Sequence, residues 1–228
     1  MKKLSRGFTL VELMIATSLF SVVLMVALTG FFQIGKIYFK GVVTGETQDV
    51  AQKITDDMSS ALQFASGITP PSTPDGQGRA YMCIGTTRYT FMPNHKLISG
   101  NQTSDFGMLR DVVPSCGDPF SGGTTLSNAT EMMSPKMRIS KLCILSANGA
   151  VLNVSGTNCA GGPPPSGCPA TNPCLNNLYM VNMTLAYGDD DVLNTTQPTN
   201  PTCKGDSSNS QYCAVVTLQT VVNRGYGN

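Results

Sequence analysis

The chain begins with one long hydrophobic stretch. No residue between Leu13 and Phe32 is charged, and an apolar helix of about 20 residues is what crosses the hydrocarbon core of a membrane. The stretch is longer than the apolar region of an ordinary secretory signal, and no A-x-A-like cleavage site follows it. The pattern predicts a membrane-spanning helix in residues 8–32.

The helical pattern continues beyond the predicted span. No proline occurs before Pro70, and charged and amide side chains now alternate with apolar ones, as in an amphipathic helix. The apolar positions recur mostly at steps of three to four residues: Ile34, Ile37, Val42, Val50, Ile54, Met58 and Leu62. A helix over residues 8–64 would be roughly 85 Å long. We expect residues 33–66 to lay one face of this helix on the rest of the chain.

Four glycines lie in the middle of the predicted helix: Gly30, Gly35, Gly41 and Gly45. Each weakens a helix by up to about 1 kcal/mol relative to alanine. They would either permit local stretching of the helix or allow other helices to pack closely against it. The sequence leaves both alternatives open.

After residue 66 the pattern changes to short strands between long polar loops. Residues 67–78 are rich in Pro, Ser, Thr and Gly, which is typical of a linker. Period-two alternation or Val- and Thr-rich composition predicts strands at 88–92, 136–146, 178–187 and 213–222. The stretches 100–135 and 156–177 exceed usual loop lengths and require disulfides or extra structure. The sequence predicts an α+β fold in which a long helix packs on an antiparallel sheet.

All eight cysteines follow the hydrophobic stretch: Cys83, Cys116, Cys143, Cys159, Cys168, Cys174, Cys203 and Cys213. An even number behind a membrane-crossing segment indicates disulfides in an oxidising compartment. The spacing is wrong for common structural zinc sites, because no C-x-x-C pair occurs and His95 is the only histidine. Eight cysteines allow 105 pairings, so spacing alone does not assign the bonds.

Charge sets the orientation and argues against one class of partner. Lys2, Lys3 and Arg6 precede the apolar stretch, and such cations hold this end of a helix in the cytoplasm. From Ala65 onward nine basic residues face nine acidic ones. A chain that binds nucleic acid through its overall field shows a basic excess, which is missing here.

Glu12 is an acid inside the predicted span. A carboxylate in a membrane helix costs a few kcal/mol and requires a partner. Cleavage after Gly7 would create an amino group at Phe8, which on a neighbouring subunit is a suitable cation. The basic leader, Gly7 and the run Phe8-Thr9-Leu10-Val11-Glu12 together resemble the processing site of type IV prepilins and type II secretion pseudopilins. The alternative is a plain signal anchor with an accidental glutamate.

The resemblance implies a life cycle in two stages. A prepilin peptidase, a membrane aspartyl protease, would cleave between Gly7 and Phe8 on the cytoplasmic side and methylate Phe8. Glu12 would neutralise a neighbour's terminus during assembly. The subunit would stand in the inner membrane, with its N-terminus cytoplasmic, and then enter a periplasmic or cell-surface filament through an inner-membrane assembly platform. Its parts would be a leader (1–7), a membrane and filament-core helix (8–32), its amphipathic continuation (33–66) and a pilin-like β-rich head (67–228).

Cys203 and Cys213 bracket a polar loop before the last predicted strand. Pairing them would close a small C-terminal loop similar to the disulfide-bounded region of many pilins.

Asp189, Asp191 and Asn194 offer oxygen ligands of the kind that suit calcium. The order does not match an EF-hand loop, and the alternative is a solvated turn after the strand at 178–187. We therefore predict no metal site beyond this calcium candidate.

Lys136, Arg138 and Lys141 form a basic stretch that would contact DNA or a glycan, or else form a solvated strand face. His95 has no recognisable acid partner, and neither a nucleophile elbow nor a phosphate-binding loop occurs. We therefore predict no catalytic residues, no cofactor and no enzymatic activity.

The sequence favours a structural subunit. The first hypothesis is a minor pilin of a type IV pilus, because the head is large and rich in cysteine. A J-type minor pseudopilin of a type II secretion system is the second, since the head-size range and Glu12 fit both. A signal-anchored extracytoplasmic binding protein, or an enzyme on the same anchor, is the remaining class.

Overall fold

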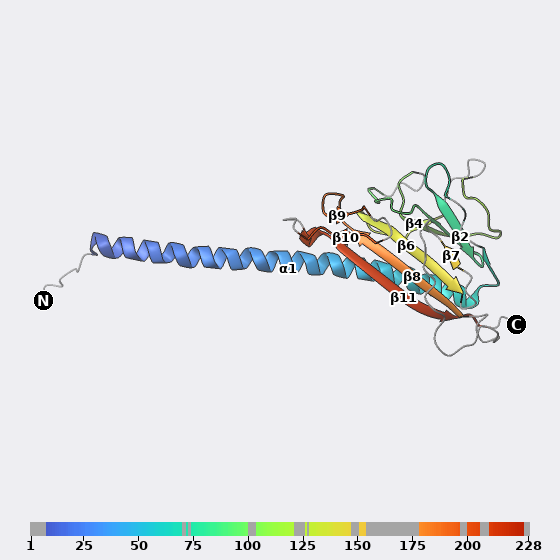
Figure 1. Ribbon diagram of the computed structural model, residues 1–228, viewed down its shortest axis with the longest axis horizontal. Helices are drawn as coiled ribbons and strands as arrows, with labels where there is room; N and C mark the ends of the chain where they lie inside the picture. Colours follow the sequence, from blue (N-terminus) through green and yellow to red (C-terminus); the bar gives the residue numbers. More distant parts are fainter. Residues whose placement is uncertain are drawn as a thin grey trace.

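The computed structural model describes residues 8–69, 72, 74–99, 104–120, 126, 128–146, 151–153, 178–196, 200–205 and 210–225. The leader, residues 1–7, and the predicted loop at 156–177 lie outside these residues. Within them, a long helix and a β-rich head make up the fold, and the N-terminal half of the helix projects from the head (Figure 1).

The long helix is α1, which runs over Leu10–Phe64. It begins at the N-cap Thr9 and ends at Ala65, whose φ of −69° and ψ of 134° are extended. The helix runs without a break through Gly30, Gly35, Gly41 and Gly45. The sequence prediction of one helix over residues 8–64 is confirmed.

A five-stranded antiparallel sheet forms one part of the head, in the order β1-β2-β3-β4-β5. Its strands are β1 Ile68–Thr69, β2 Ala80–Ile84, β3 Thr87–Phe91, β4 Met108–Val112 and β5 Thr130–Glu131. The turn between β2 and β3 begins at Gly85, whose φ of 61° favours glycine. The β2–β3 hairpin therefore lies beside the end of α1, where a Cβ at Gly85 would sit 3.4 Å from the Cα of Ala65.

The second sheet has the order β11-β8-β6-β7 and is also antiparallel. Its strands are β6 Met137–Ser146, β7 Val151–Asn153, β8 Leu178–Tyr187 and β11 Ala214–Asn223. β9 Leu193–Asn194 and β10 Thr202–Cys203 form a small separate ribbon, and a 3-10 helix, η2 Ser210–Tyr212, precedes β11. In Figure 1, β11, β8 and β6 lie diagonally beside the C-terminal half of α1.

One core joins the helix to both sheets. Ala51, Ile54, Met58 and Leu62 of α1 are fully buried, in one cluster with residues of β2, β3, β6, β8 and β11. Their spacing of three to four residues places them on one face of the helix. The C-terminal half of α1 is therefore part of the head's core.

The structure confirms the α+β fold class and places a strand at each of the four predicted positions, as β3, β6, β8 and β11. Two expectations need correction. The head has two main sheets where one was expected, and the predicted linker at 67–78 contains β1. The stretch at 100–135 contains β4 and β5, which are extra structure of the kind that its length required.

Candidate functional site

The start of α1 is closed by a reciprocal pair of hydrogen bonds between Thr9 and Glu12. The backbone N–H of Glu12 donates to the Thr9 hydroxyl at 3.3 Å. Oε2 of Glu12 accepts from the Thr9 backbone N–H at 3.0 Å and from its hydroxyl at 2.8 Å. This is a capping box, and it places the carboxylate where the helix dipole favours negative charge.

The capping box gives Glu12 hydrogen-bond donors within its own chain. The sequence suggested an acid that a neighbour's amino group must satisfy, yet Glu12 already accepts hydrogen bonds from its own chain. It lies in the first turn of α1, and Phe8, where cleavage after Gly7 would create the new terminus, comes directly before the N-cap Thr9. Gly7 itself lies outside the described residues.

The N-terminal half of α1 presents an uncovered apolar surface. Every described residue from Phe8 to Val42 is exposed or half-buried, and Val43 is the first buried residue of the helix. The most apolar 18-residue window has a mean hydropathy of 2.3, and none of it is buried. By length and composition, this helix is able to cross a membrane.

The packing boundary lies later than the pattern predicted. Ile34, Ile37 and Val42 were expected on the face that meets the head, but their exposed fractions are 68%, 74% and 49%. Val50 is half-buried, and the fully buried residues of the helix begin with Thr47 and continue with Ala51 and Ile54. Residues 33–42 therefore belong with the uncovered half, apart from the contacts of Phe39 and Lys40 at the edge of the head.

Two disulfides connect described cysteines. Cys83 of β2 bonds to Cys116, and Cys203 of β10 bonds to Cys213, which is the pairing expected from the loop they bracket. Cys143 of β6 is disulfide-bonded as well. Cys159, Cys168 and Cys174 lie outside the described residues.

The aspartate run after β8 is held by cations of the same chain. Asp189 pairs with Lys96 at 3.0 Å and with Lys136 at 3.1 Å, and Asp190 pairs with Arg138 at 2.7 Å. Hydrogen bonds from these lysines lower the pKa of Asp189, and the bond from Arg138 lowers the pKa of Asp190. The run is therefore an ion-paired turn, and the basic stretch supplies its partners.

The calcium candidate loses its main ligand to these pairs. Asp189 is bound by two ammonium groups, and Asn194 accepts hydrogen bonds from Thr196. Among the residues that the structure describes, no group of three or more His, Cys, Asp or Glu side chains is placed to hold a metal ion. Within the described residues, the aspartate run is a turn in which Asp189 and Asp190 pair with cations of the same chain.

His95 has an acid partner that the sequence did not reveal. Its Nε2 lies 2.9 Å from Oδ1 of Asp105. Oδ1 of the same carboxylate also accepts a hydrogen bond from the backbone N–H of Ile98, and Oδ2 accepts one from the backbone N–H of Ser99. Burial raises the pKa of Asp105, but the hydrogen bonds from Ser99, His95 and Ile98 outweigh it, so the pKa is low. This carboxylate closes the loop after β3.

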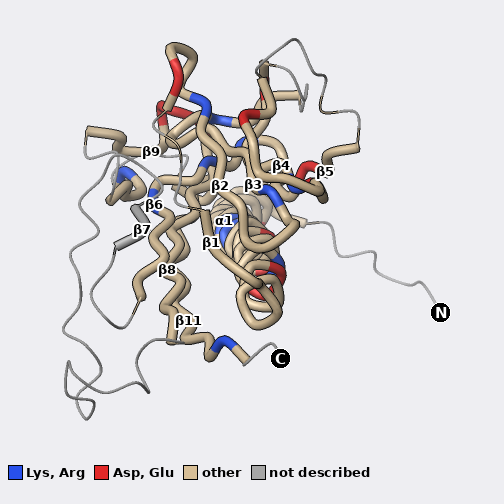
Figure 2. The backbone as a smooth tube through the Cα atoms, turned by 90° about the vertical axis from the view of Figure 1, so that its right-hand side faces the viewer, with Lys and Arg blue, Asp and Glu red and all other residues tan. Residues whose placement is uncertain are grey.

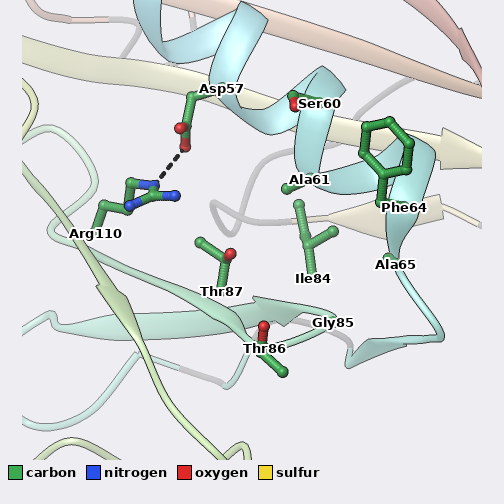
Figure 3. Close-up of a pocket in the computed structure, with 10 residues that line it drawn as sticks. All are labelled: Asp57, Ser60, Ala61, Phe64, Ala65, Ile84, Gly85, Thr86, Thr87 and Arg110. Atoms are coloured by element: carbon green, nitrogen blue, oxygen red, sulfur yellow. Dashed lines mark hydrogen bonds and ion pairs between the residues drawn. The ribbon is translucent and has the colours of Figure 1, made fainter.

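A hollow of about 230 Å³ lies between the end of α1 and the β2–β3 hairpin (Figure 3). Asp57 and Arg110 form an ion pair at one side of it, with Nε of Arg110 2.9 Å from Oδ2 of Asp57. The same oxygen accepts a hydrogen bond from the Tyr89 hydroxyl at 2.6 Å. Burial, followed by the contact with Asp57, raises the pKa of Tyr89. These contacts tie α1 to β3 and β4.

Acidic and basic residues are interspersed over the head (Figure 2). The pairs described above show why: Asp57, Asp189 and Asp190 each lie against a basic side chain from another segment. The described surface therefore has no broad field of one sign of the kind that attracts nucleic acid.

Comparison with known families finds one match at the N-terminus. The prokaryotic N-terminal methylation motif matches residues 2–28, which cover most of the leader, the predicted cleavage position and the first part of α1. Comparisons with curated proteins and with solved structures found no match. The motif is the prepilin-type cleavage and methylation signature, and it occurs here on a long uncovered helix in front of a disulfide-bonded head. The chain therefore carries the N-terminal cleavage and methylation signature of type IV pilins and pseudopilins.

Proposed function

We propose that the chain is a minor pilin, a structural subunit assembled into a type IV pilus or at its tip. The prepilin-type motif implies processing by a prepilin peptidase and assembly with other pilin subunits. In this proposal the peptidase cuts between Gly7 and Phe8 and methylates Phe8. The inner-membrane assembly platform then moves the subunit into the filament.

The observation that carries the proposal is the uncovered half of α1. Exposed apolar patches on ordinary soluble proteins reach only a few hundred Å². Here the helix is uncovered along about 50 Å, taking residues 10–42 at 1.5 Å each. Its apolar side chains include Phe20, Leu24 and Phe32, all exposed. Lipid before assembly and the helices of other subunits afterwards would cover this surface.

We assign a separate role to each of four segments of the chain. Residues 1–7 are the leader, and residues 8–32 are the membrane span and later the filament core. Residues 33–66 carry the helix to the head, which comprises residues 67–228 and stands outside the cytoplasm. The cations of the leader favour this orientation, and disulfides fit an oxidising compartment on the head's side.

Glu12 is proposed to pair with the amino terminus of a neighbouring subunit. The capping box orients its carboxylate toward the start of the helix, where the amino group of a processed chain would stand. The neutralised pair lowers the cost of burying both charges in an apolar filament core.

The mature N-terminus provides the direct test. Mass spectrometry of the full-length protein purified from its natural host should show a chain that starts with a methylated Phe8. A chain that keeps residues 1–7 would contradict processing and leave a tethered head.

A second experiment tests the role of Glu12. Glu12→Ala should leave membrane insertion intact and reduce incorporation into filaments, measured by the amount of subunit in sheared pili. Glu46→Ala is the matched control, because Glu46 is an exposed glutamate on the same helix beyond the predicted span. Equal incorporation of Glu12→Ala and the natural protein would contradict the pairing role.

The choice of filament is tested genetically. Deleting the gene should reduce surface pili and leave secretion of exoproteins unchanged. Loss of secretion with normal pili would contradict the minor pilin and favour a J-type pseudopilin. The head size and Glu12 of this chain fit both kinds of subunit.

A further inference from the structure

Aromatic side chains mark the place where the uncovered half of α1 meets the head. The rings of Phe39 on α1 and Tyr212 on η2 lie 5.9 Å apart. One residue further along each segment, the Lys40 ammonium group donates a hydrogen bond to the backbone carbonyl of Cys213. The Cys203–Cys213 disulfide closes the loop that carries Tyr212. These contacts hold Tyr212 at the height of Phe39 along the helix axis.

This edge of the head faces the uncovered part of α1. In Figure 1, β11 begins beside the middle of α1, at the end of the head nearest the bare helix, and runs toward the far end. Val43, the first buried residue of α1, lies one helical turn beyond Phe39. The exposed fractions of Phe39 and Tyr212 are 48% and 44%, so both rings keep about half of their surface open.

Along the axis of α1, this edge lies where a membrane-spanning segment would end. From Leu13 to Gly35 the helix has no charged residue, a length of about 35 Å at 1.5 Å per residue. A hydrocarbon core is about 30 Å thick. The next positions bring Lys36, the first charge after Glu12, and the exposed rings of Tyr38 and Phe39. Aromatic rings and lysines at the end of a span are the pattern of a membrane–water interface.

We propose that the edge formed by Phe39 of α1 and Tyr212 of η2 rests on phospholipid headgroups before assembly. This edge is then a second membrane contact, on the leaflet at the head's side. The open faces of the rings lie among the upper acyl chains, the Tyr212 hydroxyl meets the headgroups, and Lys36 meets their phosphates. This inference rests on the insertion of α1 that the proposed function requires.

Lipid fits this edge better than a protein partner for two reasons. The edge is continuous along α1 with the apolar surface that the membrane covers, so a span seated in the bilayer brings the edge to the headgroups. The exposed chemistry is aromatic rings with cations, Tyr38 and Phe39 beside Lys36, which is what headgroups attract. The consequence is that extraction of the subunit must break this contact as well as remove the span from the bilayer.

Tryptophan fluorescence tests the proposal on the full chain, which contains no natural tryptophan. Three single variants place the same probe at different heights: Phe20→Trp in the span, Tyr212→Trp at the edge, and Phe64→Trp at the end of α1. Phe64 is the matched control, because its side chain is 85% exposed on the same helix and lies about 38 Å beyond Phe39. Each variant is placed in phospholipid vesicles with bromine near the headgroup or deep in the acyl chains.

Tyr212→Trp should lose more emission with the shallow bromines than with the deep ones, and its emission maximum should shift to shorter wavelength on insertion. Phe20→Trp should respond more to deep bromines, and Phe64→Trp should respond to neither. If Tyr212→Trp responds no more than Phe64→Trp while Phe20→Trp is quenched, the edge does not touch lipid and the inference is overturned. If Phe20→Trp is not quenched, insertion itself fails, and the proposed function fails with it.

Discussion

The two halves of α1 have the same backbone conformation and opposite surroundings. Residues 10–42 project from the head with their apolar side chains exposed, whereas residues 43–64 bury one face in the core. Most helices in proteins are stabilised by tertiary packing of one face, and only the second half has that packing within its own chain. The first half requires an apolar environment from outside. One helix thus contributes both to the core of the head and to an apolar surface that its own chain leaves uncovered.

The polar residues of the two halves differ in the same way. In the uncovered half, Glu12 caps its own helix, and no further charge occurs until Lys36. In the packed half, Asp57 receives a hydrogen bond from Tyr89 and an ion pair from Arg110. The carboxylate of the first half therefore closes the start of α1, and that of the second half joins α1 to the head.

The largest expected difference between the halves comes from truncating one leucine in each. Leu62→Ala should lower the free energy of unfolding of the head by about 2–5 kcal/mol, because Leu62 is fully buried. Leu24→Ala, in the uncovered half, should change it by less than about 0.5 kcal/mol. Thermal or urea unfolding of the detergent-solubilised full chain measures both. Equal losses would show that the head also depends on the uncovered half.

The disulfide at the boundary should have the next largest effect. Replacing Cys203 and Cys213 by serine should cost about 3 kcal/mol, the value expected for a loop of this short length. Trypsin should then cut faster after Lys40, which contacts the loop, while cleavage after the exposed Lys36 stays unchanged. Unchanged cleavage after Lys40 would show that the disulfide does not secure the loop to the helix.

Replacing one glycine by alanine in each half of α1 should have a smaller effect on stability. A Cβ at Gly35 or at Gly45 would meet no atom within 4 Å, so each change should favour helix by about 0.5–1 kcal/mol. Only Gly45→Ala should raise the melting temperature of the head, because only its segment is coupled to the core. If Gly35→Ala has the same effect, the boundary at Val43 is not an energetic one.

Acid should weaken the head slightly, because the fold holds two of its carboxylates in ion pairs. The pKa values of Asp189 and Asp190 are lowered in the fold, so their stabilisation is complete above the unfolded value of about 3.9 and is lost as the pH falls below it. Both groups are partly exposed, so each pair contributes less than about 1 kcal/mol.

Unfolding at pH 5 and at pH 3 measures this effect. Asp189→Asn should show a smaller loss of stability between the two pH values than the natural chain does. The low pKa of Asp105 acts in the same direction in both proteins. An equal loss in the variant would show that Asp189 contributes nothing.

The periodicity of the sequence predicted the long helix and the long strands, but it did not predict the short buried strands. β8 was found because it alternates, and α1 because its apolar positions recur at helical steps. β2 and β4 were missed, since their buried positions run together without alternation. β4 also lies in a stretch rich in turn residues, where composition indicates a loop.

The polar clusters were missed for a different reason. The residues Lys96 and Asp189 are 93 positions apart, and Tyr89 is 32 positions from Asp57. Nothing in a local window relates such residues, so the aspartate run looked like a turn or a cation site. Two sheets had to fold before Lys96, Lys136 and Arg138 could meet it.

The sequence by itself determined the N-terminal processing signature and the outline of the long helix. Membrane length, the placement of one glutamate and helical periodicity are local properties of consecutive residues, and each has a direct physical cost or gain. Tertiary structure alone decided where burial starts on α1, which cysteines join, and which cations hold each carboxylate. Those outcomes depend on contacts between segments far apart in the chain, and only the packed head brings these segments together.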